Sequence, residues 1–439
     1  MNCRLRRRIN VVAGALIVFA ALAYLGFAGV LWTAQAAEPP VPLLAKDQPV
    51  DWWFVFKFNS SKSFAGCGGT TKNEIKRTCP FDKGIRAQDY KHYSQQFVFA
   101  GGKADGVDED KSKLKAGTGC LGQSTDDPVG ATYAQIYKGR FFYVVWNDDF
   151  HGSPSFKGCK KSCGTPWGHS KGILAWDHSG QGVVMQVSTP SWPATGSDRF
   201  PRKGEASTLG CLTHNNIMFS QHFFALKLDK DDLVKVLKAL ENASAPTGNI
   251  PQLINPGGPQ DVQDLVARLG KQSKSTEHIR EELSSKVILI SKPSGLHVPP
   301  WQLVSAIMEQ EALPLRTATW WNDPKIFSTL KSHKIGCADL KERPGAVAIA
   351  TTGHWKGIEF GLTGGAPNPN LNHAKIAVSK EGEPYAIFGD LNQQGGISEP
   401  NCAKSQNGRG GLFYVVKNPA LHKSLKELIE GGTAETRAK

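Results

Sequence analysis

Two short sequence units with the same layout, one in each half of the chain, constrain its fold more than any other feature. The first passes from His169-Ser170-Lys171 into an apolar run, a Ser-Gly turn and a second apolar run at 182–187. The second passes from His373-Ala374-Lys375 into an apolar run, a turn at 381–384 and an apolar run at 385–388. Each unit predicts a strand, a tight turn and a return strand. Together they predict a two-fold internal repeat.

Other segments predict a mixture of strands and helices on both sides of a linker. Apolar runs rich in aromatic and β-branched residues predict strands at 51–58, 95–99, 141–146, 286–291 and 344–351, with a turn at 147–149. Apolar residues at helical spacing predict helices at 231–240, 262–269, 300–308 and 421–429. Frequent Pro and Gly predict a linker at 242–261. The sequence therefore predicts an α/β fold, with mixed sheets flanked by helices, in a first repeat at 45–241 and a second at 262–432.

The first 36 residues have the marks of a targeting segment. Four arginines between positions 4 and 8 precede an apolar run at 11–32, and Ala34-Gln35-Ala36 forms a cleavage signal. The apolar run has 22 residues and is long enough to cross a bilayer of roughly 30 Å as a helix. The sequence favours cleavage of a signal peptide at 1–36 and leaves a retained membrane anchor open. Either outcome predicts an exported protein that is secreted, periplasmic or in a lysosome-like lumen.

Charge and cysteine content agree with export. Loss of residues 1–36 removes four arginines and no acid, so the formal charge falls from +13 to +9. A basic surface suits a polyanion such as nucleic acid, although many exported proteins are basic without binding one. Eight of the nine cysteines follow the targeting segment, which predicts disulfides of open connectivity. Cys159-x-x-x-Cys163 lacks a second pair at zinc-ligand spacing, so we expect a disulfide and no metal there.

The His-x-Lys pairs suggest chemistry on a phosphate. Residues two apart in a strand point to the same side, so His169 and Lys171 are predicted to share one face, as are His373 and Lys375. One imidazole can attack phosphorus while the other protonates the departing oxygen. The two ammonium groups can stabilise the non-bridging oxygens, so no metal or small-molecule cofactor is expected.

A purely structural interpretation of these motifs also stands. A third copy, His354-Trp355-Lys356, has no following strand pair, and we interpret it as an ordinary strand segment. Polar residues close the two return strands and are candidate supporting residues or plain turn residues: Ser188, Asp390 and Asn392. Arg409, in a Gly-rich segment, is a candidate DNA-backbone contact or part of a surface loop.

Several segments resemble the acid endonucleases of the deoxyribonuclease II family. The similar segments are VDWWFVFKF at 50–58, YVVWND at 143–148, GHSKGILAWDHSG at 168–180, STPSWP at 188–193, NHAKIAVS at 372–379 and GDLN at 389–392. They reach across most of the chain beyond the targeting segment, and their combination is specific although each alone is not.

The resemblance implies two phospholipase D-like α/β repeats related by a pseudo-two-fold axis, with one shared active site. It implies hydrolysis of double-stranded DNA without divalent cations at acid pH, with 3′-phosphate ends formed through a phosphohistidine. The catalytic set carried over is His169, Lys171, His373 and Lys375, with Asn392 in support. A general-acid histidine, with an ordinary pKa of about 6.5, gives the acid preference a chemical reason.

The sequence also departs from these families. In the phospholipase D pattern an Asp follows each Lys at fixed spacing, but Asp177 comes one residue late and no equivalent follows Lys375. The loops at 59–130 and 393–408 are unlike the animal nucleases, although the resemblance leaves Cys337 with Cys402 a plausible disulfide. The attacking histidine is not settled by these motifs, and His169 is the favoured one.

Two other functions remain open from the sequence. A phospholipase D-like phosphodiesterase could act on lipid head groups, and a non-catalytic secreted protein could bind DNA or another polyanion. Membrane contact is expected only if the segment at 1–36 is retained, and the oligomeric state is open.

Overall fold

The structure of the protein is a computed structural model. It describes residues 38–59, 96–103, 110–122, 124–150, 152–159, 162–202, 219–308, 312–364 and 371–437. The targeting segment predicted at 1–36 lies outside these ranges. Among the residues described, no helix combines the length and the apolar character that a membrane span requires.

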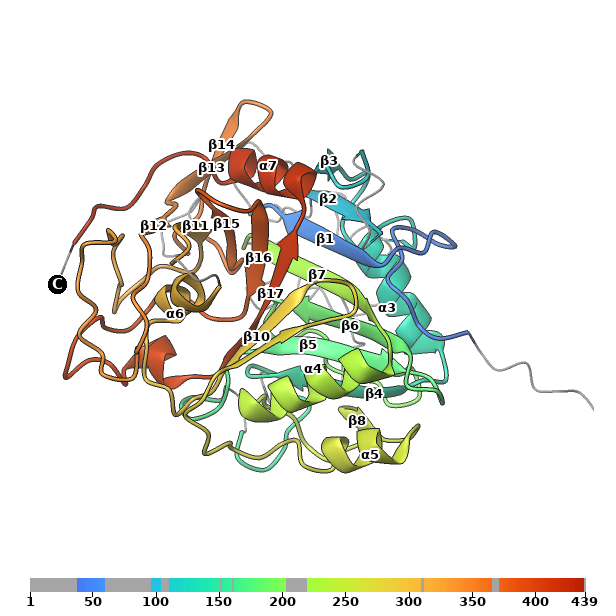
Figure 1. The fold of residues 1–439 in the computed structure, drawn as a ribbon. Coiled ribbons are helices and arrows are strands. Elements are labelled where there is room, and N and C mark those ends of the chain that lie inside the picture. Colours follow the sequence, from blue (N-terminus) through green and yellow to red (C-terminus); the bar gives the residue numbers. More distant parts are fainter. Residues whose placement is uncertain are drawn as a thin grey trace, which may run out of the picture. The chain divides into compact units, whose positions relative to one another are not determined.

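An eight-stranded sheet contains the first His-x-Lys unit, and its strands are ordered β3-β2-β1-β7-β6-β5-β4-β8 (Figure 1). Every pair of neighbours is antiparallel. Its strands are β1 (Trp52–Lys57), β2 (Phe97–Gly102), β3 (Lys115–Ala116), β4 (Phe142–Asn147), β5 (Lys171–Trp176), β6 (Gly182–Val187), β7 (Gln221–Leu228) and β8 (Ile254–Asn255).

A seven-stranded sheet contains the second unit, in the order β12-β11-β15-β16-β17-β10-β9, and only β11 and β12 pair in parallel. A separate hairpin joins β13 to β14. These strands are β9 (Ile279–Glu282), β10 (Ile288–Lys292), β11 (Leu315–Ala318), β12 (Val347–Ile349), β13 (Thr352–Trp355), β14 (Ile358–Gly361), β15 (Ile376–Ser379), β16 (Tyr385–Gly389) and β17 (Gly411–Lys417).

Helices accompany both sheets, and local sequence accounts for where they begin. Asp229 and Asn418 cap α4 and α7 by accepting backbone N–H groups, and proline opens α3, α6 and α7. The apolar residues at helical spacing in α4 are all buried, as predicted. The helices are α3 (Pro128–Lys138), α4 (Lys230–Asn242), α5 (Gln260–Val266), α6 (Pro300–Ile307), α7 (Pro419–Leu428) and the short 3₁₀ helix η2 (Ser405–Gly408).

The two sheets share an order of five strands. In the first sheet the order β1-β7-β6-β5-β4 surrounds the first His-x-Lys unit, and in the second the order β10-β17-β16-β15-β11 surrounds the other. If β1 is matched to β10, β4 to β11 and β5–β7 to β15–β17, the five strands occur in the same chain order. The predicted α/β fold class is confirmed, whereas the pseudo-two-fold relation between repeats stays a prediction.

Aromatic side chains from the first sheet stack on one ring of the second. The Phe388 ring on β16 lies 4.5 Å from that of Phe54 on β1 and 4.8 Å from that of Phe224 on β7, measured between centroids. All three side chains are fully buried. Such stacked rings add to the stabilisation from burial of apolar area. The faces of the two sheets therefore pack together, and residues Pro39–Lys439 form one compact unit.

The segment predicted as a linker at 242–261 is part of the first sheet rather than a free connection. Pro246 and Leu253 accept backbone hydrogen bonds from β4, and β8 pairs with β4 directly. Its Pro and Gly residues lie outside β8, so they interrupt no hydrogen bond of the two-residue strand. The repeat boundaries themselves stay a prediction.

Candidate active site

A pocket of about 310 Å³ gathers side chains from both sheets. It contains every predicted site residue except Asp390, which lies beneath its wall. Sequence reasoning missed the other seven lining residues, among them Asp148, Trp320 and Gln394. The lining residues are Asp148, Asp149, Ser162, His169, Lys171, Ser188, Pro190, Trp320, His373, Lys375, Asn392, Gln394, Gln406 and Arg409.

The two His-x-Lys motifs enter this pocket through matching backbone contacts. The His169 N–H donates to the Gly410 carbonyl at 2.8 Å, and the His373 N–H donates to the Ser220 carbonyl at 2.7 Å. Each motif is thus bound to the chain just before a strand of the other sheet. Only Lys171 lies within a strand, because β5 begins there and β15 begins after Lys375. The prediction that the motifs lie within strands was therefore wrong, but both members of each pair line the same pocket, and the exchanged hydrogen bonds help to position them.

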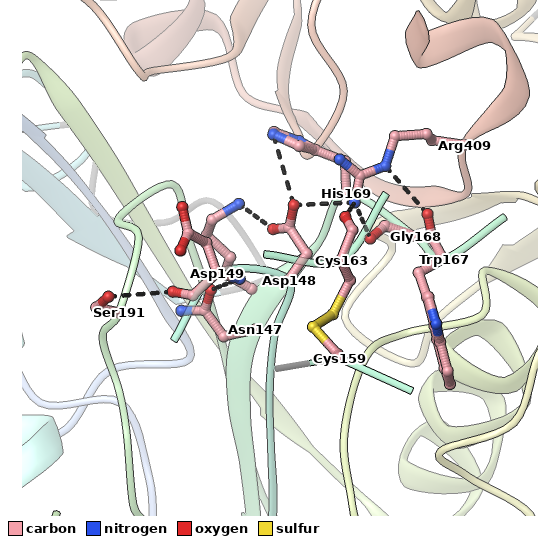
Figure 2. Close-up of a disulfide and its surroundings, with 11 residues drawn as sticks. Asn147, Asp148, Asp149, Cys159, Cys163, Trp167, Gly168, His169, Ser191 and Arg409 are labelled. Carbon is pink, nitrogen blue, oxygen red and sulfur yellow. Dashed lines mark hydrogen bonds and ion pairs between the residues drawn. A yellow bond between two sulfur atoms is a disulfide. The ribbon is translucent and has the colours of Figure 1, made fainter. Parts of the chain in front are cut away.

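Asp148 organises the first half of the pocket, although the sequence predicted only a turn there. Its buried carboxylate accepts a short charged hydrogen bond from Lys171 and another from Arg409 at 2.9 Å (Figure 2). Its Oδ2 lies 4.0 Å from His169 Nε2. Burial by itself would raise the pKa of Asp148, but the nearby cations, Lys171 before Arg409, outweigh it and hold the pKa well below the usual range. Asp148 is therefore an anion even in acid.

The His169 ring is oriented by a backbone carbonyl. Its Nδ1 lies 2.8 Å from the Asp390 carbonyl oxygen, which can only accept, so Nδ1 carries the hydrogen and Nε2 keeps its lone pair when the ring is neutral. Burial and then the Lys171 charge lower the pKa of His169 well below its ordinary value. The neutral ring thus turns a nucleophilic nitrogen towards Asp148 and the pocket.

The Asp390 side chain supports this carbonyl from below. Its carboxyl accepts from the Leu412 N–H at 2.8 Å and from Gln186 Nε2 at 3.0 Å. Burial raises the pKa of Asp390 to about 7, against the opposing effect of these hydrogen bonds. Asp390 therefore positions His169 through its own backbone and does not line the cavity.

The second half of the pocket surrounds His373 with aromatic rings. The Phe219 centroid lies 4.1 Å from the imidazole and the Trp320 centroid 4.8 Å from it. Lys375 Nζ donates to the His373 carbonyl at 2.6 Å. Burial and then the Lys171 charge lower the pKa of Lys375 well below its ordinary value. A bound anion would offset the cost of placing this ammonium here.

Ser188 and Asn392 both lie in the pocket wall. The Ser188 hydroxyl accepts from the His222 N–H at 2.9 Å and donates to Gln221 Oε1 at 2.6 Å. Gln221 Nε2 in turn lies 3.3 Å from His373 Nδ1. The Asn392 amide donates to Gln394 at 3.0 Å, and its buried Oδ1 has no hydrogen-bond partner among the described residues. Ser188 thus reaches His373 through Gln221, and Asn392 offers an acceptor to the pocket.

Arg409 lies in the pocket but not in a surface loop. Its side chain is buried, and its guanidinium donates to Asp148 and to the backbone carbonyls of Trp167, Gly168 and Cys163 (Figure 2). The surface-loop interpretation was therefore wrong. A contact of Arg409 with DNA stays a prediction, since the structure supports first a role in holding Asp148.

The third His-x-Lys sequence is absent from the pocket lining. His354 lies on the β13–β14 hairpin, half-exposed, with its Nε2 3.2 Å from the Glu359 carboxylate.

Two predicted disulfides are confirmed, Cys159–Cys163 and Cys337–Cys402. In the part of the chain that the structure describes, no group of three or more His, Cys, Asp and Glu side chains could hold a metal ion.

The backbone pattern around the two motifs matches, but the side chains differ. Ser188 and Asp390 occupy matching places, because each donates its N–H at 3.0 Å to the next strand, to His222 and Leu412 respectively. Extending the strand registers places Asp148 opposite the middle residue of the first motif and Trp320 opposite that of the second. One histidine therefore faces a carboxylate and the other an indole.

The fold is mixed α/β, and its pocket combines two histidines with buried cations. This arrangement is typical of an enzyme that acts on phosphate esters, because the cations can bind the phosphate while the histidines carry out nucleophilic and acid–base chemistry. The profile of the Deoxyribonuclease II family matches residues 88–433. The chain belongs to the deoxyribonuclease II family, as its motifs predicted, and is a hydrolase that acts as a deoxyribonuclease. Members of this family are typically lysosomal or secreted. Among curated proteins, no match to this chain was found.

Proposed function

We propose that this deoxyribonuclease is a metal-independent acid endonuclease that cuts double-stranded DNA through a phosphohistidine and leaves 3′-phosphate ends. The observation that carries the proposal is the environment of His169. Its Nδ1 is engaged by the Asp390 carbonyl at 2.8 Å, so Nε2 is the nitrogen available for attack. Its pKa is lowered well below the ordinary value, first by burial, which favours the neutral, nucleophilic ring.

The two histidines divide the reaction between them. In the first step His169 Nε2 forms a bond to phosphorus while the bond from phosphorus to the 5′ oxygen breaks, and His373 gives that oxygen a proton. In the second step water attacks the phosphohistidine and His373 takes the proton of the water. The nitrogen–phosphorus bond breaks, and the 3′-phosphate leaves. Because His373 must begin as an imidazolium, an acidic medium favours the reaction.

Lys171 and Lys375 supply the charge stabilisation that the phosphoryl oxygens need. Both ammonium groups line the same pocket as the two histidines. In a site shielded from water such fixed charges stabilise a transition state more strongly than they would in bulk solvent. The pair therefore takes the electrostatic role that a metal ion has in other nucleases.

The DNA partner and export from the cytoplasm belong to the same proposal. A formal charge of +9 without residues 1–36 suits attraction to a DNA backbone that weakens as salt rises. The predicted targeting segment would deliver the protein to an oxidising compartment, where disulfides such as Cys159–Cys163 and Cys337–Cys402 form and persist.

Plasmid digestion in EDTA at about pH 5 tests the proposal, with protein lacking residues 1–36. Nicked and linear products should appear, and their 3′ ends should block a polymerase until a phosphatase is added. His169→Ala and His373→Ala should each reduce cutting by a thousandfold or more while circular dichroism stays native. Intact plasmid after treatment with folded enzyme would refute the proposal. Release of choline from phosphatidylcholine without cleavage of DNA would favour a lipid phosphodiesterase instead. Salt-sensitive DNA binding that yields no product in the wild-type protein and survives both substitutions would favour a binding protein.

A further inference from the structure

We propose that the Cys159–Cys163 disulfide and Arg409 form a clamp that positions Asp148, and through it the His169–Lys171 half of the active site. Cys163 is the point where the clamp meets the site. Its N–H donates to the Asp148 carbonyl at 2.7 Å, and its own carbonyl accepts from Arg409 Nη2 at 2.7 Å (Figure 2). One residue thus holds the backbone of Asp148 and the cation that binds its carboxylate.

The disulfide fixes Cys163 to a buried aromatic cluster. Its partner Cys159 donates its N–H to the Phe156 carbonyl at 3.2 Å. The Phe156 ring packs edge-on against Phe150 and Trp167, with centroid distances of 6.1 and 6.5 Å. Both cysteines are buried, at 6% and 2% exposure. Without the covalent link, Cys163 would be held by the hydrogen bond from its N–H to Asp148 and the one that its carbonyl accepts from Arg409.

Arg409 extends the clamp to the residues just before His169. Its Nη2 donates to the Gly168 carbonyl at 2.7 Å and its Nε to the Trp167 carbonyl at 3.0 Å. A side chain at Gly168 would meet the Ala243 carbonyl at 2.5 Å, so the backbone here has no room to shift. The planar guanidinium can make these contacts at once, which a lysine cannot.

The clamp also joins the two sheets. Arg409 lies directly before β17, whereas the disulfide and Asp148 belong to the chain around β4 and β5. Lys292 Nζ, fully buried at the end of β10, fixes the Arg409 backbone by donating to its carbonyl at 2.9 Å and to that of Asn407 at 2.7 Å. Loss of the disulfide is therefore expected to misplace Asp148, Lys171 and His169 while both sheets remain folded.

The activity test of the clamp rests on the proposed function, and a chemical test does not. In Cys159→Ala/Cys163→Ala protein with a native circular dichroism spectrum, we expect kcat for DNA cleavage to fall at least tenfold and KM to change less than threefold. We also expect diethylpyrocarbonate to modify His169 at least threefold faster, measured by peptide mass spectrometry. Cys337→Ala/Cys402→Ala removes a disulfide outside the clamp and should leave both quantities unchanged.

Arg409→Ala tests whether the two parts act as one device. If they do, adding it to the double cysteine variant should lower kcat no further than the more severe of the two changes alone. Additive losses, or a double cysteine variant with wild-type kcat and His169 reactivity, would overturn the clamp. If wild-type protein fails to cut DNA, the proposed function fails, while the His169 modification rate still decides for or against the clamp.

Discussion

Asp148→Asn is the substitution whose effect the geometry specifies best. The carboxylate is 3% exposed and holds two cations, Lys171 and Arg409, with the latter at 2.9 Å. An amide of the same shape can accept from only one of them and turns its NH₂ group towards the other. At an effective dielectric constant of about 20, a 2.9 Å ion pair has about 6 kcal/mol of Coulomb attraction before desolvation is subtracted. Removal of one partner from such a buried pair typically costs about 3–5 kcal/mol, which is the expected loss in free energy of unfolding.

In Asp148→Asn the cations Lys171 and Arg409 lose their carboxylate partner, so an anion bound beside them is expected to restore part of the lost free energy of unfolding. Phosphate at about one hundred times its dissociation constant stabilises a protein by about 2.7 kcal/mol. We expect it to stabilise Asp148→Asn more than wild type, because in wild type the Asp148 carboxylate competes for the same groups. Since the pKa of Asp148 is lowered on folding, its contribution is complete above the unfolded value of about 3.9 and is lost only as the pH falls through the folded value. Asp148→Asn and wild type can therefore be compared at pH 5, where the contribution of the Asp148 carboxylate to stability is still nearly complete.

Urea unfolding at pH 5, with and without inorganic phosphate, measures both effects. Asp110→Asn is the matched control, because it removes a carboxylate from an exposed ion pair with Lys113 at 3.0 Å. It should change stability by less than about 1 kcal/mol and should not alter the response to phosphate. An Asp148→Asn protein as stable as wild type, or an equal gain from phosphate in both proteins, would refute the reasoning.

Three further predictions concern the surroundings of the two histidines. Burial raises the pKa of Asp390 to about 7, so its stabilising contribution is full below about pH 3.9 and is lost as the pH rises to 7; Asp390→Asn should flatten the fall in the free energy of unfolding between pH 4 and 7, by up to about 4 kcal/mol in urea unfolding. Trp320→Ala should lower kcat about tenfold by freeing the His373 ring, whereas Trp320→Phe should keep most activity; equal rates in all three proteins would exclude the stack as a support. Arg409→Lys should lose kcat nearly as far as Arg409→Ala in steady-state assays, because an ammonium cannot replace the four hydrogen bonds of the guanidinium, and near-wild-type activity would contradict this.

Most strands and helices could be predicted because their signals are local. The apolar run at 51–58 became β1, the apolar run at 182–187 matches β6, and the periodic residues at 231–240 lie within α4. β7 and β17 were not predicted, although both lie at the centre of their sheets. Strand order arises from pairing between segments far apart in the chain, which no local pattern encodes.

The site was only partly accessible to the same reasoning. The motif residues could be selected because each occurs at the same place in a repeated unit. Asp148 could not, because Asn-Asp-Asp after a strand is ordinary turn sequence and only the fold brings Lys171 and Arg409 to it. The segment of Arg409 was interpreted as surface because the residues that bury its side chain belong to the first half of the chain and are not visible from the local sequence. Its burial depends on carbonyls 241 to 246 positions away.

In the proposed mechanism, the difference between the two halves of the pocket gives the two histidines different tasks. Their backbones are held alike, through His169 to Gly410 and His373 to Ser220. The residue facing each motif is a carboxylate, Asp148, in one case and an indole, Trp320, in the other. The Asp148 carboxylate pairs with Lys171 and Arg409. Burial is the main cause that lowers the pKa of His169, and it favours the neutral ring that can act as a nucleophile. The Phe219 and Trp320 rings pack against His373 and position its ring through uncharged contacts. A duplicated motif can therefore serve as nucleophile once and as acid once, because side chains outside the motif make the two environments unequal.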